Sequence, residues 1–366
     1  MFVGLGFMAF MSVTTLAIDV GMLMTAKTQA QTAADSSALA GATALAFNSA
    51  SDYTSSGPAV QSAINAAIAA GNGVVGSPVS INASDVSFQP DPVTGTIDRV
   101  KVAVYRTAAR SNAVPTLIGS IFGIRSVDVG ATATAETIPA NAENCIKPWA
   151  VPDKWIENTN PPWDGTDTFN AHPLSPTLTP DGFVGTNSAG YSGYNPQTNA
   201  GTKLTLTSNA GTVSGVQTYF RVDLPGSSGA SDFQNDIDSC HAGTMQIGDT
   251  MTAEPLNMKA ATKAGVDALV AQDPSAYYDT TTHQVVSSLH PSPRVVVIPL
   301  YDPLQYQNTL IAGHPQIVIA DFMGFFIESA DATGKVTGWI VPIAGLTKGT
   351  GTPPVVAFGR SIRLVN

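Results

Sequence analysis

The chain begins with an uninterrupted helical pattern in two parts, MFVGLGFMAFMSVTTLAIDVGMLM (residues 1–24) and TAKTQAQTAADSSALAGATALAF (residues 25–47). The first part is apolar, and Asp19 is its one formal charge. At about 1.5 Å per residue it would extend roughly 36 Å as a helix, enough to cross a hydrocarbon layer of about 30 Å. We therefore expect residues 1–24 to form a transmembrane helix.

A cleaved signal peptide is the competing interpretation of this start. Such a peptide has a basic first region, a shorter apolar core and a break in structure after its cleavage site. Here no basic residue precedes the apolar run, and the helical pattern continues to about Phe47 without a proline. These features favour a membrane anchor, and the missing basic residues leave a start upstream of Met1 open. Lys27 is the one basic residue near the span, so the positive-inside rule gives only a weak indication of the orientation of the helix in the membrane.

Small side chains line one face of the second part. They recur at intervals of four and three residues, a mean period of about 3.5, as in helix-packing seams. We call this set the small-residue seam: Ala26, Ala30, Ala33, Ser37, Ala40, Ala44 and Phe47. Small residues let a neighbouring backbone approach closely. The neighbour can be another subunit or the chain's own domain, and the sequence leaves both open.

Asp19 needs an explanation, because a carboxylate deep in a bilayer costs about 2.5–3.5 kcal/mol on insertion scales. In one hypothesis it pairs with a polar group or N-terminus of a neighbouring subunit during assembly, alongside the small residues Ala17 and Gly21. In the other it marks the water edge of the span. Both hypotheses stay open at this point.

Composition narrows the class of protein. Charged residues make up 12% of the 366 residues, about half the usual share. The net charge of −10 and the lack of Lys/Arg clusters argue against a nucleic-acid-binding protein. An apolar share of 43% argues against disorder. An uncharged polar surface of this kind is common in secreted and envelope proteins.

A small α+β module follows the first helix. Helical spacing predicts a helix over residues 57–73 and a short one over 114–124, and alternation predicts strands over 79–88, 97–106 and 126–136. Together with residues 25–47 this gives a pilin-like domain, 25–140, that ends in a linker around Ile138–Asn141.

The run LAIDVGMLMTAKTQAQTAADSSALAGATAL (residues 16–45) resembles the N-terminal signature of TadG-like proteins of the Flp/Tad (tight adherence) pilus systems. In that family an apolar span leads into a small-Asp-Val-Gly step, here Ile18–Gly21, and then into an Ala-Ala-Asp helix, here from Ala33 to Ala42. The family's usual basic and polar residues before the span are absent.

This resemblance implies a non-enzymatic, single-pass inner-membrane component of such a pilus, either a minor pilin-like subunit or an assembly factor. Its bulk would lie in the periplasm or at the cell surface. Its partners would be other pilus subunits and the assembly platform, reached through the N-terminal helix.

Residues 141–366 are expected to form a second, β-rich domain, an antiparallel barrel or sandwich with one helix over 256–272. Strand-like runs occur at 203–207, 216–224, 294–302, 315–330, 336–344 and 355–365. Residues 330–335 predict a hairpin turn. Segment 158–202 is rich in Asn, Pro, Gly and aromatics and indicates long ordered loops.

Cys145 and Cys240 are the two cysteines of the chain. In an exported domain a pair is the smallest disulfide set, so we expect them to be bonded. The alternative is two free buried thiols.

No motif predicts catalysis, a metal or a cofactor. Gly71, Gly73 and Gly76 match a dinucleotide fingerprint in letters, but they follow a helix instead of a strand. The five histidines have no zinc-site spacing, and Asp35–Leu39 lacks the second serine of a metal-dependent adhesion site. The competing function is an envelope-anchored hydrolase or carbohydrate-binding protein that uses the aromatic loops 149–194. The β-rich domain could in either case bind a surface glycan or protein.

Overall fold

A computed structural model of the protein describes residues 2–47, 53–69, 79–90, 92, 97–209, 214–240, 243–289, 291–344 and 358–365, without the side chains of residues 2–16, 47, 122 and 197. The chain forms two units. Unit 1 comprises Met1–Ile138 and Ile362–Asn366, and unit 2 comprises Pro139–Ser361. The sequence assigned residues 141–366 to the second domain, whereas the structure returns the last five residues to unit 1.

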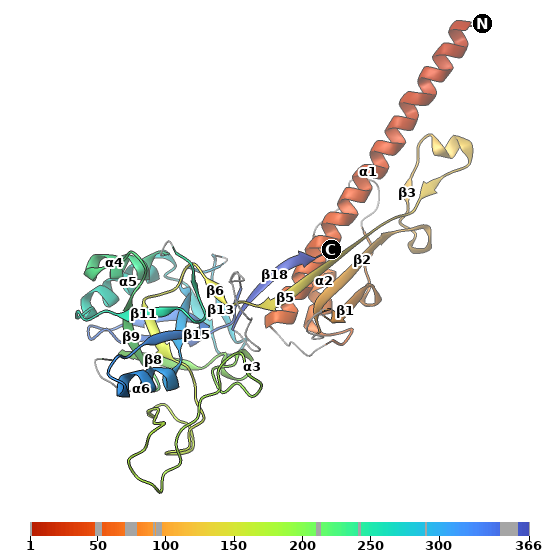
Figure 1. The fold of residues 1–366 in the computed structure, drawn as a ribbon. Helices are drawn as coiled ribbons and strands as arrows, with labels where there is room; N and C mark the ends of the chain where they lie inside the picture. Colours follow the sequence, from red (N-terminus) through yellow and green to blue (C-terminus); the bar gives the residue numbers. More distant parts are fainter. Residues whose placement is uncertain are drawn as a thin grey trace. The chain divides into compact units, whose positions relative to one another are not determined.

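Unit 1 is a layer of two helices on a sheet (Figure 1). The helices are α1 (Phe2–Phe47) and α2 (Pro58–Ala69). The strands lie in the order β1 (Val86–Pro90), β2 (Ile97–Arg106), β5 (Val129–Pro139) and β18 (Gly359–Val365). The predicted helix at the N-terminus and the strand at 97–106 are confirmed. Among the helices that the structure describes, none has an apolar stretch long enough to span a membrane.

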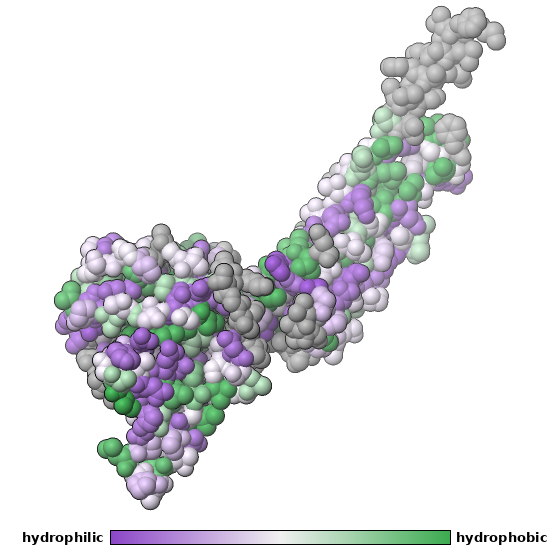
Figure 2. Space-filling view, in the orientation of Figure 1, coloured by the Kyte–Doolittle hydropathy of each residue, from purple (hydrophilic) through white to green (hydrophobic). Residues whose placement is uncertain are grey.

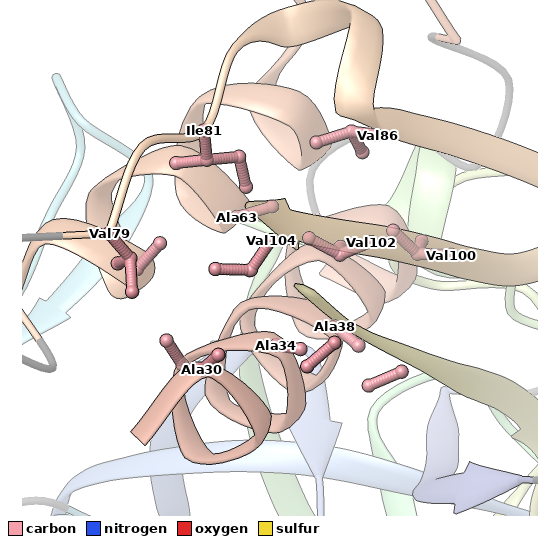
Figure 3. Close-up of a cluster of buried hydrophobic side chains, with 14 of the residues drawn as sticks. Ala30, Ala34, Ala38, Ala63, Val79, Ile81, Val86, Val100, Val102 and Val104 are labelled. Carbon is pink, nitrogen blue, oxygen red and sulfur yellow. The ribbon is translucent and has the colours of Figure 1, made fainter. Parts of the chain in front are cut away.

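Alanines of the two helices meet valines of the sheet in the core of unit 1. Figure 3 shows Ala30, Ala34 and Ala38 of α1 and Ala63 of α2 facing Val100, Val102 and Val104 of β2. These three valines alternate along the strand and are fully buried, as period-2 alternation requires of a strand with one covered face. Because the helical side chains are methyl groups, α1 lies close to both α2 and β2.

Gly41 marks the closest approach in this core. A Cβ atom at this position would lie 2.9 Å from Val100 Cγ1, 3.3 Å from the Ala59 carbonyl oxygen and 3.4 Å from Ala63 Cβ. A larger side chain would therefore push α1 away from both neighbours at once.

The C-terminal strand is fastened to unit 1 by a buried carboxylate. Glu136 on β5 is 1% exposed and accepts hydrogen bonds from Arg99 on β2 (2.8 Å) and from Arg363 on β18 (2.7 Å). One acid thus links three neighbouring strands of the sheet.

Two predictions for unit 1 are corrected. The strand expected over 79–88 begins only at Val86, because Asn82 and Asp85 form a capping box around the turn η1 (Ala83–Asp85). Residues 114–124 are a hairpin and not a helix: β3 (Val114–Pro115) pairs with β4 (Ser126–Val127), and between them lies one 3₁₀ turn, η3 (Gly119–Phe122), that ends at Gly123 with φ +87°. A third 3₁₀ turn, η2 (Ala108–Arg110), follows β2.

Unit 2 contains a closed six-stranded barrel. Its strands pair in the ring β15-β14-β7-β9-β8-β16, and β16 pairs again with β15. The strands are β7 (Trp149–Pro152), β8 (Lys203–Ser208), β9 (Thr218–Asp223), β14 (Val295–Tyr301), β15 (Ile317–Ala330) and β16 (Val336–Ile340). β11 (Thr250–Ala253) pairs with both β9 and β15. The expected β-rich domain is confirmed, and the turn at 330–335 joins β15 to β16 as predicted.

The barrel differs from the expectation in two respects. It is mixed, because β14 pairs with β7 and β8 with β9 in parallel. It also carries more than one helix. The predicted α5 (Lys259–Gln272) is joined by α4 (Gly229–Asp238), α6 (Pro303–Ile311) and the short α3 (Pro196–Asn199). The remaining short strands are β6 (Ala142–Glu143), β10 (Met245–Gln246), β12 (Tyr277–Asp279), β13 (Gln284–Val286) and β17 (Ile343–Ala344).

The close approach at Gly41 yields a test of the unit 1 core. We expect Gly41→Leu to lower the free energy of unfolding of unit 1 by about 1–3 kcal/mol through overpacking. Gly21→Leu is the matched control, because a Cβ at Gly21 meets nothing within 4 Å. All four tryptophans lie in unit 2. The unfolding curve of Gly41→Leu measured by far-UV circular dichroism, which reports on both units, should therefore shift to lower denaturant concentration. The curve measured by tryptophan fluorescence, which reports on unit 2, should not shift. Equal effects of the two substitutions would contradict the packing argument.

Candidate functional site

Asp19 binds a loop of its own chain. Its carboxylate accepts hydrogen bonds from the backbone N–H groups of Leu117 (2.8 Å), Ile118 (2.9 Å) and Gly119 (2.8 Å). Both carboxylate oxygens are used, and the side chain is 6% exposed. These three amides stand at the start of η3, where N–H groups have no partner within the turn. Asp19 thus supplies from α1 the cap that the loop lacks locally.

This arrangement bears on the hypotheses for Asp19. The acid has a partner inside unit 1, which neither the neighbouring-subunit hypothesis nor the water-edge hypothesis included. Ala17 and Gly21 are both exposed, two residues to either side of Asp19. Two residues correspond to about 200° around a helix, so this small pair lies on the side of α1 away from the loop. The structure therefore separates Ala17 and Gly21 from Asp19, and their role in assembly stays a prediction.

The small-residue seam is buried within unit 1. Ala26, Ala30, Ala33, Ser37 and Ala44 are all buried, Ala40 is half-buried, and the side chain of Phe47 lies outside the described ones. Ala34, Ala38 and Ala42 are buried as well, so the covered face is broader than the seam. Its cover is the chain's own α2 and β2. Packing of the seam against another subunit stays a prediction.

Cys145 and Cys240 form a disulfide, as expected, with their Cα atoms 4.8 Å apart. The bond joins the segment after β6 to the residue that follows the C-cap of α4. Beside it, buried Lys147 donates through Nζ to the carbonyl oxygens of Asp236 (3.1 Å) and Ser239 (2.5 Å). A cation there satisfies the last carbonyls of α4. Burial lowers the pKa of Lys147 to about 8.

A buried acid cluster, which the sequence analysis missed, lies in unit 2. It consists of Asp153 after β7, Asp321 in β15 and Tyr191 between them. Tyr191 Oη lies 2.7 Å from Asp153 Oδ2 and 3.3 Å from Asp321 Oδ2. Both aspartates are fully buried. The one available signal was an isolated acid inside the apolar run of Ile317–Ile327.

The surroundings of the acid cluster favour the protonated form of its carboxyl groups. The Tyr191 hydroxyl lies within hydrogen-bond reach of both aspartates, but its one hydrogen reaches a single acceptor at a time. Burial and the neighbouring Asp153 raise the pKa of Asp321 well above its usual range. Burial raises the pKa of Asp153 to about 7. Two close carboxyl groups cannot both ionise cheaply away from water.

A pocket of about 210 Å³ is lined in part by Val318–Ala320, which precede Asp321 in the sequence. Its lining comes from the loop 183–188, Ile247–Gly248, α6 and the start of β15. Asp302, Gln305 and Thr186 are its polar side chains of note. Within the described ranges of the chain, no group of three or more His, Cys, Asp or Glu side chains is placed to hold a metal ion.

Three aromatic residues of loops 149–194 pack on one another. Trp155 and Phe169 are each 2% exposed, with ring centroids 5.6 Å apart. Trp163 packs edge-on against Trp155 at 4.4 Å. These rings form a small core of their own, which is a structural role that long loops require.

The clamp at Asp19 yields a prediction for the loop. We expect Asp19→Ala to free the three amides, so that the N–H groups of Leu117, Ile118 and Gly119 exchange with deuterium faster than in the unchanged protein. Asp35→Ala is the matched control on the same helix, because Asp35 accepts a hydrogen bond from Gln31, four residues away. Mass spectrometry of peptides that cover residues 114–127 measures the effect. Unchanged exchange in Asp19→Ala would contradict the clamp.

The acid cluster yields a prediction for pH. A carboxyl whose folded pKa lies above its unfolded value of about 3.9 stabilises the fold below that value and loses this contribution as the pH rises through the folded pKa. We therefore expect the stability of unit 2 to fall between about pH 4 and pH 7. In Asp321→Asn this fall should be smaller, because one of the two carboxyl groups whose pKa is raised in the folded state no longer titrates.

Tryptophan fluorescence during denaturation at a series of pH values measures this dependence. Asp267→Asn is the control, because Asp267 is exposed and forms an ion pair only with Lys263 among the described residues. A variant Asp321→Asn with the pH dependence of the unchanged protein would overturn the assignment.

Comparison with known proteins bears on the N-terminal helix. The family model described as putative Flp pilus-assembly TadE/G-like matches residues 1–44. No curated protein matches the chain. No solved structure matches it either. The matched residues comprise nearly all of α1, including Asp19 and most of the small-residue seam. The resemblance stated from the sequence is thereby confirmed for residues 1–44, which are similar to the TadE/G-like pilus-assembly family.

Proposed function

We propose that this protein is a non-enzymatic component of a Flp/Tad-type pilus, a minor pilin-like subunit or an assembly factor, that is anchored in the inner membrane by α1. The match of residues 1–44 to the TadE/G-like pilus-assembly family is the observation that carries the proposal. That match supports a role in pilus assembly in general, and the finer assignment rests on the arguments below.

The construction of α1 supports an anchoring role. Its first residues, Phe2–Leu16, carry no formal charge, and the helix continues from them through the packed part of unit 1 without interruption. Figure 1 shows the N-terminal part of α1 projecting beyond the sheet of unit 1. One helix thus joins an apolar segment rigidly to a folded domain, as the stem of a pilin-like subunit requires.

The disulfide supports an extracytoplasmic location for unit 2. Disulfides persist in oxidising compartments such as the bacterial periplasm and are rare in the cytosol. The bond between Cys145 and Cys240 closes a loop with a sequence separation of 95. We place unit 2 in the periplasm or at the cell surface, where a surface glycan or another protein would be its ligand.

Deletion of the gene tests the proposal. We expect the deletion strain to lose surface pili and adherence, and the full chain supplied in trans to restore both. The protein should stay in the membrane fraction after an alkaline carbonate wash, and added protease should reach unit 2 in spheroplasts. A deletion strain with normal pili would contradict the proposal. If the deletion strain has normal pili, and the purified full chain hydrolyses an envelope polymer or binds a glycan, the enzyme or carbohydrate-binding function is favoured instead.

A further inference from the structure

Large apolar side chains are exposed at the end of unit 1 where Asp19 lies. Three come from α1 and three from the loop of residues 116–125, and each is between 44% and 74% exposed. We call this set the apolar collar: Ile18, Val20, Met24, Leu117, Ile121 and Ile124. Figure 2 shows apolar side chains along this end of the described surface. Apolar exposure concentrated in one place marks an interaction site.

The loop holds its side chains outward by an ordered structure. Thr116 N–H donates to the Arg125 carbonyl (3.1 Å), and Ile124 N–H donates to the Gly119 carbonyl (2.8 Å). A Cβ at Gly119 would lie 2.7 Å from Thr116 Oγ1 and 2.9 Å from the Ile124 carbonyl oxygen, so the loop is closed tightly at its base. Asp19 fastens the same loop to α1 through three hydrogen bonds. The exposure of Ile121 and Ile124 is therefore built into the fold.

The charges around the collar fit a lipid surface. Asp19 is the one acid before Lys27, and both its oxygens accept amide hydrogen bonds. Exposed Arg125 is the last residue of the loop. Exposed Lys27, whose Nζ donates to the Gly130 carbonyl, lies about 12 Å farther along α1 than Asp19. Asp128, the first acid after Arg125 in the chain, accepts a hydrogen bond from the Ala108 N–H. An apolar band bordered by Arg and Lys is the arrangement of interfacial membrane segments, whose cations meet lipid phosphates.

The position of the collar points to the same occupant. It surrounds α1 where the uncharged sequence Phe2–Leu16 ends and the packed part of unit 1 begins. A peripheral segment at this level would lie at the boundary between headgroups and acyl chains if α1 crosses the bilayer. Burial of apolar surface is favourable in proportion to the area removed from water, so six partly exposed side chains together favour that boundary.

We propose that the apolar collar is inserted into the outer boundary of the membrane that α1 enters, so that the loop 116–125 is a second lipid contact beside the helix. The loop then fixes the depth of α1 and prevents its rotation about its own axis, with Asp19 as the clamp between the two. This inference rests on the proposed membrane anchoring and adds a lipid-binding surface to it.

A fluorophore on the loop tests the proposal in the full chain. In Ile121→Cys the new thiol can be labelled with the environment-sensitive dye NBD, because both natural cysteines are bonded to each other. The labelled chain is reconstituted into vesicles of phosphatidylethanolamine and phosphatidylglycerol, with and without doxyl-labelled lipid. Ile68→Cys is the matched control, since Ile68 on α2 is 66% exposed but lies outside the collar.

We expect emission of the Ile121→Cys label to shift to shorter wavelength and to be quenched by doxyl lipid, and the Ile68→Cys label to do neither. If the protein floats with the vesicles but the label at residue 121 emits as it does in water, the collar proposal is overturned and the proposed anchoring by α1 is not. A shift that grows with the protein-to-lipid ratio and is not quenched by doxyl lipid would assign the collar to a second protein copy, which also overturns it. A chain that does not float with vesicles would overturn both proposals.

Discussion

The close approach of α1 to α2 and β2 is the constraint on which the rest of unit 1 depends. The inner face of α1 is built mainly from methyl groups, and Gly41 shows how little space is left there. Small side chains bury little area each, so the stability of this layer comes from many contacts at short range. The same composition that suits helix packing explains why this part of the chain carries so few charges.

Removing a carboxylate from water is unfavourable, and the fold compensates for it in different ways at Asp19 and Asp321. Asp19 keeps its charge in a setting of three amide donors, which replace the hydrogen bonds of water. Asp321 is placed where like charge and burial favour its protonated form. The first solution ties two segments of unit 1 together, whereas the second is the basis of the pH dependence expected for the barrel. Only the first lies where the proposed function needs a fixed geometry.

Local patterns in the sequence predicted the elements that local forces decide. The helix over residues 1–47, the strand 97–106 and the turn at 330–335 follow from periodicity and turn chemistry, and the disulfide follows from cysteine count and compartment. The apolar run 114–124 predicts a helix, although Gly119 and Gly123 permit the tight turn that it forms. Its partner, Asp19, is about a hundred residues away, and no local pattern reports such a pairing. The acid cluster and the parallel pairs of the barrel likewise depend on segments far apart in the chain. These features are set by tertiary structure.

The return of the C-terminal strand to unit 1 has a consequence for the order in which the protein matures. The chain leaves unit 1 after β5, completes the whole of unit 2, and only then supplies Arg363, the third member of the link at Glu136. If the polypeptide is translocated starting from α1, the sheet of unit 1 lacks one strand until β18 emerges. Completion of unit 1 would then report that unit 2 has been delivered, and a chain truncated before β18 would present an open sheet edge to proteases.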